Sequence, residues 1–547
     1  SGTLYLVIAG GDCPPTLTPN CYVYNTNPAY NGGYFSNDGG DTWQPMQSLN
    51  ANFADTEAWY ALELAVDPLN PYLVYGGGLN AWYTPNAQAG SGNWQQISDG
   101  NSPTSLHADQ HNMVFAPGCT ASPCAAYFVN DGGIYYYDPH QTSPYKDLNT
   151  APLAISEFTG GDLGANFNTI KVALGGTQDN GTDLYQNSLW NETNGGDGGF
   201  TQIDQTNTQY MYTEYISGDV RQSTNGGQTF PEQVTGLPGS RPHPCCWQVP
   251  NTLLYAPLAL DRLDNNHLAL GAADAVYETT NATKSFLGNP LISWYQGSQI
   301  FSTAVSAIAI SPKNSAVIYA GLSDGTIYKT IHADVNNSQA TYNQLASPNP
   351  GAFISSISID PHDENRVVVT TGKTASPVSG GIFLTTDGGI SWASITGTLP
   401  QYPINTSVVY YSGGVPVIVV GTDYGVYFTT NDGGLWQGLN NGLPNVPVVQ
   451  LALDQQWTTL IAYTHGRSAW TFPISAVGHI DTIGIFRPSV TNGTFYLRLH
   501  NSTGYADITV AYNPASKPYP IVGDWTGNGY DTVGVFDQSN GLFNLRN

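Results

Sequence analysis

The stretch SNDGGDTW, residues 36–43, combines acidic side chains, two glycines, hydroxyl groups and an indole within eight positions. The Asp38 side chain can accept hydrogen bonds from backbone N–H groups of its own turn. The glycines can take positive φ without a clash at Cβ, and the Trp43 ring can pack against neighbouring strands. The stretch therefore predicts a tight turn, although a metal-binding loop or a catalytic carboxylate would also contain such residues.

The same pattern returns along the chain, as STNGGQTF (223–230), TTDGGISW (385–392), one residue shorter as TNDGGLW (430–436), and partially as VNDGGIY (129–135). A catalytic group is not expected to recur in this way, so Asp38 and its equivalents are predicted to be structural. Around each copy, four short apolar or aromatic segments recur; the first ends in Asp-Pro or Ser-Pro and the second in glycine. Four short strands in roughly 40–50 residues are typical of a β-propeller blade.

With these motifs, the chain resembles the Asp-box (BNR) propellers, which include sialidases, sortilin-type ectodomains, two-propeller xyloglucanases and secreted bacterial proteins. The resemblance covers residues 1–474. It implies an all-β fold with about eight to ten four-stranded propeller blades, in one ring or two. A propeller places the Asp-box turns on one face and the loops that enter each blade on the other.

Residues 478–547 form a second region with its own repeat, in which DTIGIF (481–486) returns as DTVGVF (531–536) and FYLR (495–498) as FNLR (543–546). The segment GDWTGNGYDTVGVF is similar to the calcium loops of FG-GAP repeats, which implies a small, incomplete β repeat module. Carboxylate and amide oxygens suit calcium, and the candidate ligands are Asp524, Thr526, Asn528 and Asp531. Asp531 falls one position early for that pattern, and the alternative is a hydrogen-bonded turn without metal.

The formal net charge of −25 limits the choice of partners. Such a surface repels phosphate backbones, which argues against nucleic acid and against attachment to a membrane through basic residues. No run of roughly 18 apolar residues is present, so no transmembrane helix is expected. Neutral glycans, surface proteins and divalent cations remain as partners.

The six cysteines fall in local pairs: Cys13 with Cys21, Cys119 with Cys124, and Cys245 beside Cys246. Their spacing differs from that of zinc sites and favours disulfides, hence a secreted or cell-surface protein. Adjacent cysteines have Cα atoms only about 3.8 Å apart, so a bridge between Cys245 and Cys246 would be strained. The alternative is that each of these two thiols pairs elsewhere.

Three stretches on the loop-entry face are candidates for a ligand site. LHADQH carries His107, Asp109 and His111 at alternating positions, which on a strand would project to one side and could bind a metal. GGTQDNGT (175–182) offers Asp179, and GGDGGF (195–200) offers Asp197. The competing interpretation is that these loops pack around a central channel and that their polar side chains satisfy backbone donors.

Two enzyme classes were weighed against the residues. A sialidase needs three arginines around the substrate carboxylate, and the few arginines of residues 1–474 argue against it. Resemblance to the two-propeller xyloglucanases would make Asp131, in NDGGIYYYD, and Asp197 an acid and base pair, although neither motif matches fully. The expected function is therefore a non-catalytic binding or structural protein whose propeller binds glycan or protein and whose C-terminal module mediates attachment or assembly; the alternative is a glycoside hydrolase.

Overall fold

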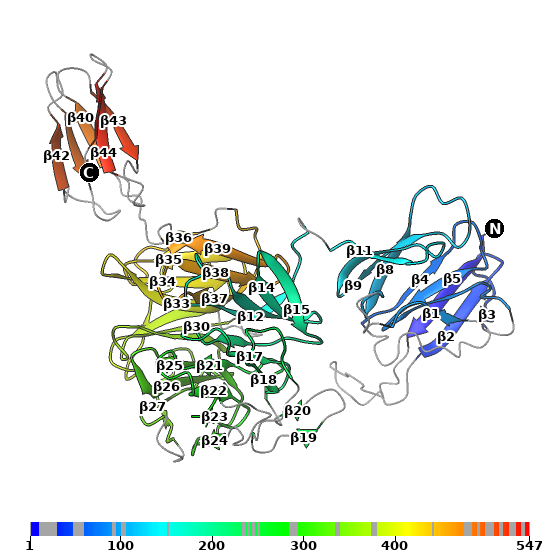
Figure 1. The fold of residues 1–547 in the computed structure, drawn as a ribbon, viewed down its shortest axis with the longest axis horizontal. Coiled ribbons are helices and arrows are strands. Elements are labelled where there is room, and N and C mark those ends of the chain that lie inside the picture. Colours follow the sequence, from blue (N-terminus) through cyan, green and yellow to red (C-terminus); the bar gives the residue numbers. More distant parts are fainter. Residues whose placement is uncertain are drawn as a thin grey trace. The chain divides into compact units, whose positions relative to one another are not determined.

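The computed structural model contains β-strands and connecting segments but no helix among the residues that it describes (Figure 1). The all-β prediction is confirmed. The chain divides into two compact units, Ser1–Ile155 and Ser156–Asn547, called here the N-terminal and C-terminal units. The described residues are 2–9, 30–46, 60–89, 94–99, 105–149, 153–231, 237, 241–242, 247–248, 252–283, 294–333, 340–372, 380–439, 442–474, 484–488, 493–497, 508–512, 518–523, 532–537 and 542–545.

The described residues of the N-terminal unit form three antiparallel sheets, and within each sheet the strands pair in chain order. β4 contacts both β1 and β8, so consecutive sheets pack on one another. The strands are β1 (Leu4–Ala9), β2 (Tyr30–Ser36) and β3 (Gln44–Pro45); β4 (Glu63–Val66), β5 (Val74–Gly77), β6 (Ala81–Thr84) and β7 (Gln95–Gln96); β8 (Gln110–Phe115), β9 (Ala126–Asn130), β10 (Gly133–Tyr137) and β11 (Tyr145–Asp147).

In the C-terminal unit, the described residues between 158 and 473 form seven sheets of the same kind. The first three comprise β12 (Phe158–Leu163), β13 (Ala173–Thr177), β14 (Gly181–Gln186) and β15 (Leu189–Asn194); β16 (Thr201–Ile203), β17 (Met211–Glu214) and β18 (Val220–Ser223); β21 (Leu258–Leu260), β22 (Leu268–Gly271), β23 (Val276–Thr279) and β24 (Tyr295–Gln296). A separate short hairpin joins β19 (Arg241–Pro242) to β20 (Trp247–Gln248).

The other four sheets comprise β25 (Val305–Ser311), β26 (Asn314–Leu322), β27 (Ile327–Thr330) and β28 (Asn343–Gln344); β29 (Ile354–Ile359), β30 (Val367–Thr371), β31 (Gly381–Thr385) and β32 (Ala393–Ser394); β33 (Ile404–Ser412), β34 (Val415–Thr422), β35 (Gly425–Thr429) and β36 (Gln437–Gly438); β37 (Val448–Leu453), β38 (Thr459–Thr464) and β39 (Ala469–Pro473). The first strand of each of the seven sheets contacts the first strand of the next, from β12 through β16, β21, β25, β29 and β33 to β37. β37 in turn contacts β12.

The second strand of these sheets is the most buried. Every residue of β13, β22, β30 and β38 is buried. A strand covered on both faces carries nearly continuous apolar or small residues instead of alternating polar ones, as in LALG of β22 and VVVTT of β30. The core therefore lies between neighbouring sheets, where these strands face one another.

The C-terminal module has two three-stranded antiparallel sheets. One contains β40 (Gly484–Pro488), β41 (Gly493–Leu497) and β42 (Ile508–Tyr512), and the other β43 (Pro518–Gly523), β44 (Thr532–Asp537) and β45 (Leu542–Leu545). The repeated sequences form equivalent strands, since DTIGIF ends in β40 and DTVGVF in β44. The calcium candidates Asp524, Thr526, Asn528 and Asp531 lie outside the described residues.

The Asp-box turns hold themselves together through their own side chains. In the turn after β31, the Asp387 carboxylate accepts bonds from the Ser391 hydroxyl (2.6 Å), the Ser391 backbone N–H (3.0 Å) and the Thr385 hydroxyl (2.7 Å), which hold its pKa well below the usual range. Thr385 Oγ1 in turn accepts the Gly389 N–H (3.0 Å). Gly388 and Gly389 have φ of 75° and 95°, which explains the glycine pair.

Two box tryptophans connect their sheet to the one before it. Trp392 donates its indole N–H to the carbonyl of Ala346 (2.9 Å), which precedes β29. Trp436 donates likewise to the carbonyl of Ile395 (2.9 Å), just after β32. An indole that is mostly apolar but carries one donor suits this position between two sheets.

The sequence suggests that the copy at 430–436 is a shortened box, but the hydrogen bonds of this turn show a different register. Asn431, not Asp432, takes the position of the carboxylate: its Oδ1 accepts the Thr429 hydroxyl (2.9 Å) and the Leu435 N–H (2.9 Å). Asp432 has φ of 52° and occupies the place of the first glycine. Its carboxylate instead pairs with Arg366. Asn225 has the same role in STNGGQTF, where Oδ1 accepts the Ser223 hydroxyl (2.8 Å).

The partial copy VNDGGIY is a different turn. It connects β9 to β10, the second and third strands of its sheet, whereas the boxes after β18, β31 and β35 follow the third strand of theirs. The carboxylate of Asp131 in this turn bonds with His111 and Tyr60, which lie outside the turn. Its likeness to the Asp-box is confined to the sequence.

A buried aspartate follows the first strand of five sheets and accepts hydrogen bonds from the backbone of the turn that it begins. These residues are Asp67, Asp204, Asp261, Asp360 and Asp454, each at most 2 % exposed. Their second oxygen reaches onward to the next sheet: Asp204 accepts a bond from Asn265 (2.8 Å) and Asp360 from Tyr411 (2.9 Å). Asp454, after β37, accepts the backbone N–H of Phe167 (3.4 Å), which follows β12.

We expect Asp387→Ala to lower the thermal unfolding midpoint of the C-terminal unit, because the substitution removes the acceptor for three donors of the turn. Asp387→Asn should retain stability close to that of the native chain, since Asn225 and Asn431 perform the same role. Scanning calorimetry of both variants measures the difference. Equal midpoints for the alanine and asparagine variants would contradict the structural role of the carboxylate.

Candidate functional site

Two of the glycine-rich stretches lie together in the C-terminal unit. Asp179 is in the turn between β13 and β14, and Asp197 is in the segment between β15 and β16. The Asp179 backbone N–H donates to Asp197 Oδ1 (3.1 Å), and Asp179 has φ of 62°. Both residues are partly exposed. The turn conformation of one stretch is thus held by the carboxylate of the other.

Backbone contacts explain why these stretches are rich in glycine. A methyl group at Gly176 would lie 2.0 Å from the carbonyl oxygen of Gly199, and one at Gly198 would lie 2.2 Å from that of Gly181. The Thr159 hydroxyl bridges the carbonyls of Gly176 (3.1 Å) and Gly198 (2.5 Å). No side chain fits between the two loops, so they form one surface.

Two further residues adjoin this surface and were not predicted from the sequence. Glu214, the last residue of β17, is fully buried beneath Gly199. Its Oε1 accepts the Gly218 N–H (2.9 Å), while Oε2 has no hydrogen-bond partner within the described part of the chain. Burial, and then the charges of Asp219 and Asp197, raise its pKa to about 8. Tyr255 precedes β21, and its pKa is raised by burial and by the charges of Asp197, Asp179 and Glu214.

Arg221, seven residues after Glu214, is paired within the fold. The Arg221 guanidinium donates to Asp219 Oδ2 (2.9 Å) and Asn194 Oδ1 (2.8 Å) and stacks over the Tyr215 ring at 4.7 Å. Asp179 and Asp197 each carry a carboxylate, which is a hydrogen-bond acceptor. They can accept bonds from hydroxyl groups or bind a cationic group, whereas buried Glu214 cannot contact a ligand from solvent.

The LHADQH stretch in the N-terminal unit does not form the expected straight strand. His107 and Asp109 precede β8, Asp109 has φ of 61°, and the pairing of β8 with β9 shifts register at His111. The side chains of His107, Asp109 and His111 therefore do not project together from one face of a strand. His107 packs against Gly132, where an added methyl group would lie 2.5 Å from its Cβ.

His111 forms a small polar cluster with Asp131. The His111 Nε2 to Asp131 Oδ1 distance is 2.5 Å, and Tyr60 donates to Oδ2 (3.0 Å) while its ring meets the imidazole edge-on at 4.8 Å. Asp131 and Asp197 lie in different compact units. Among the described residues, no three His, Cys, Asp or Glu side chains are placed to share a metal ion.

The disulfide between Cys119 and Cys124 is present, as predicted. It lies in the loop between β8 and β9, where the Cys124 N–H donates to Asp67 Oδ2 (2.7 Å). The predictions for Cys13, Cys21, Cys245 and Cys246 fall outside the described residues.

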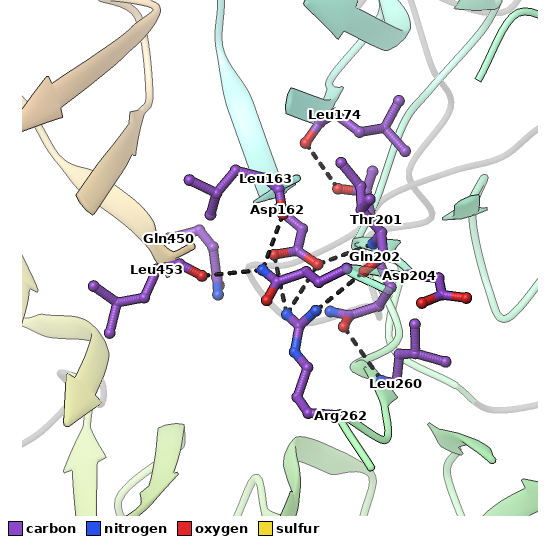
Figure 2. A network of polar contacts seen from close by, with 12 residues as sticks. Asp162, Leu163, Leu174, Thr201, Gln202, Asp204, Leu260, Arg262, Gln450 and Leu453 are labelled. Carbon is purple, nitrogen blue, oxygen red and sulfur yellow. Dashed lines mark hydrogen bonds and ion pairs between the residues drawn. The ribbon is translucent and has the colours of Figure 1, made fainter. Parts of the chain in front are cut away.

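A second polar cluster lies at the opposite ends of the strands, on the side of the Asp-box turns (Figure 2). Arg262, in the turn after β21, donates to both carboxylate oxygens of buried Asp162 in β12 (3.1 and 3.0 Å) and to the carbonyl of Ile203 (3.0 Å). Gln205 Nε2 donates to the carbonyls of Leu163 (3.0 Å) and Leu453 (3.1 Å). The cluster thus joins four of the seven sheets.

A polar cavity of about 160 Å³ lies beside Arg262. Its lining acids serve the fold: Asp204 accepts bonds from its own turn and from Asn265, and Asp261 bonds with His267 (3.0 Å). Arg262 is engaged by Asp162. Because these side chains are bonded to other residues of the fold, they indicate a structural cluster and not a ligand site.

The chain matches no protein-family model, and no curated protein resembles it closely enough to establish a relationship. The described part of the chain contains no helix that is long and apolar enough to cross a bilayer.

Arg262→Met is expected to reduce the free energy of unfolding by about 1–3 kcal/mol, because it leaves the buried Asp162 carboxylate without its charged partner. Urea denaturation measures the loss. Arg467→Met, at an exposed arginine, serves as the control and should leave stability unchanged. If the two variants are equally stable, Asp162 does not depend on Arg262.

Glu214 should make the C-terminal unit less stable as the pH rises. Its pKa is 4.5 in the unfolded chain and about 8 in the folded one, so its stabilising protonation is complete below pH 4.5 and is lost as the pH rises through 8. The free energy of unfolding of Glu214→Gln, relative to that of the native chain, should therefore increase as the pH rises from 5 to 8. Unfolding curves of the native chain and of Glu214→Gln at pH 5 and pH 8 test this. If the difference in free energy of unfolding is the same at both pH values, Glu214 does not titrate in this range.

Proposed function

We propose that residues 156–474 form a closed, seven-bladed β-propeller of the Asp-box type, and that the chain is a secreted or cell-surface binding protein without catalytic activity. The ring is supported by the contact of β37 with β12 and by the Asp454 bond to Phe167, which link the last sheet to the first. The three sheets of the N-terminal unit have the same strand order and would be blades outside this ring. The Cys119–Cys124 disulfide supports an oxidising compartment.

The proposed ligand is a neutral glycan that binds the surface of Asp179 and Asp197, called here the acidic loop surface. The proposal is carried by the Asp179–Asp197 contact: two partly exposed aspartates from separate loops are held together because the Asp197 carboxylate accepts the Asp179 N–H. Carboxylates accept hydrogen bonds from sugar hydroxyls, and the net charge of −25 disfavours anionic glycans. A basic surface protein is the other class of ligand that such a surface would attract.

Binding is favoured over hydrolysis by the burial of Glu214. A protonated carboxylic acid beside an ionised one is the pattern of a glycosidase acid and base pair. Glu214 has the raised pKa, but it is fully buried and cannot reach a glycosidic oxygen. The hydrolase alternative therefore depends on Asp131 and Asp197.

Asp197→Asn should weaken glycan binding about tenfold or more, because the substitution removes charge while the amide oxygen can still accept the Asp179 N–H. Affinity electrophoresis through a panel of neutral polysaccharides, including xyloglucan and β-glucan, measures the change. Asp387→Asn, in an Asp-box turn at the other ends of the strands, is the control and should bind as the native chain does.

Two outcomes would contradict this proposal. Release of oligosaccharides that stops in both Asp131→Asn and Asp197→Asn would establish the hydrolase. Retention by no polysaccharide in the panel would reject neutral glycan as the ligand.

The C-terminal module is proposed to mediate attachment or assembly. Its support is the repeat that it contains and the exposed aromatic side chains on its second sheet.

A further inference from the structure

The C-terminal module contains the same phenylalanine pair twice. Phe486 in β40 lies opposite Phe495 in β41, with ring centroids 4.6 Å apart. Phe536 in β44 lies opposite Phe543 in β45, with centroids 4.8 Å apart. Because these residues occupy the same places in DTIGIF and DTVGVF and in FYLR and FNLR, the two sheets present equivalent aromatic pairs.

The two pairs differ in burial. Phe495 is 3 % exposed and packs with Val535, which is fully buried, while Phe486 and Val533 lie at the edge of this small core. Phe543, the equivalent of Phe495, is 62 % exposed. The valines of the second sheet thus cover the phenylalanines of the first sheet.

The uncovered pair belongs to a larger aromatic face. Tyr519 in β43 lies opposite Phe536 and is 55 % exposed. Tyr519, Phe536 and Phe543 therefore form one row across all three strands of the sheet, called here the aromatic face. Rows of exposed aromatic side chains of this kind mark binding surfaces.

The repeat sequence indicates what would cover this face. Side chains alternate along a strand, so Val533 and Val535 lie on one side of β44 and Phe536 lies on the other. The second repeat thus offers its β-branched face to the first repeat, and its phenylalanine face lies on the opposite side of the sheet. The first repeat, DTIGIF, has isoleucines in the sequence positions of these two valines.

We propose that the aromatic face docks the first repeat of a second copy of this chain, in the way that the second repeat covers Phe486 and Phe495 within one copy. This contact rests on the assembly role proposed for the module, with a second copy as the partner and the aromatic face as the surface. Because the two docking faces differ, the contact is heterologous and joins copies head to tail. Burial of the aromatic row would provide the driving force.

The test is sedimentation velocity of the full chain across the micromolar range. The native chain should self-associate, and Phe543→Ser should weaken that association about tenfold or more, since a buried aromatic at the centre of a contact carries much of its energy. Leu542→Ser is the matched control: Leu542 is 59 % exposed and adjacent, but it points to the opposite side of β45. The control should associate as the native chain does.

A chain that stays monomeric throughout this range would overturn the proposal, and so would association that Phe543→Ser leaves unchanged. Circular dichroism of each variant separates loss of docking from loss of folding, and Tyr519→Ser provides a second variant on the same face if Phe543→Ser unfolds the module. Glycan binding through the acidic loop surface, measured on the same proteins, should be unaffected. Failure of self-association is therefore distinguishable from failure of the glycan-binding proposal.

Discussion

A buried carboxylate at the end of the first strand joins each of several sheets to its neighbour. One oxygen of Asp204 or Asp360 satisfies the backbone of its own turn, and the other accepts a bond from Asn265 or Tyr411 in the next sheet. Asp454 makes the same kind of link back to the turn after β12. Buried carboxylates are tolerated only when they are fully bonded, so these links require neighbouring sheets to keep a constant spacing. The box tryptophans add bonds in the opposite direction along the chain.

The acidic loop surface depends on that spacing. Asp179 and Asp197 come from loops at the other ends of the strands, and their contact requires the β12 and β16 sheets to approach until the glycine backbones touch. At the turn side, the Asp162 carboxylate of β12 accepts the N–H of Ile203 in β16, and Arg262 of the next sheet bonds to both residues. Figure 2 shows Asp162 and Arg262 in this cluster. The two sheets are thus held together at both ends of their strands, and the loop end carries the partly exposed carboxylates. Function concentrates in such loops because a rigid scaffold positions them.

The strands, the boxes and the Cys119–Cys124 disulfide could be predicted because their signals are local. The Asp-box bonds join residues two to four positions apart, as in Thr385, Asp387 and Ser391. Local similarity also misled: NDGG occurs at 130–133 and at 431–434, but the first is a hairpin turn and the second has Asn431 as its acceptor. Register within a turn is decided by which side chain reaches the preceding hydroxyl, and both Asn431 and Asp432 were compatible with the letters alone.

The sequence by itself determined an all-β chain of repeated four-stranded units, since alternating apolar segments, glycines with positive φ and self-bonded turns act over a few residues. It also determined the acidic character that limits the partners. Only the tertiary structure decided that Glu214 and Tyr255 adjoin Asp179 and Asp197, that His111 pairs with Asp131, and that Phe495 is buried while its repeat equivalent Phe543 is exposed. These features depend on contacts between separate strands and sheets. The energies of such contacts come from burial and from nearby charges, which a short stretch of sequence does not specify.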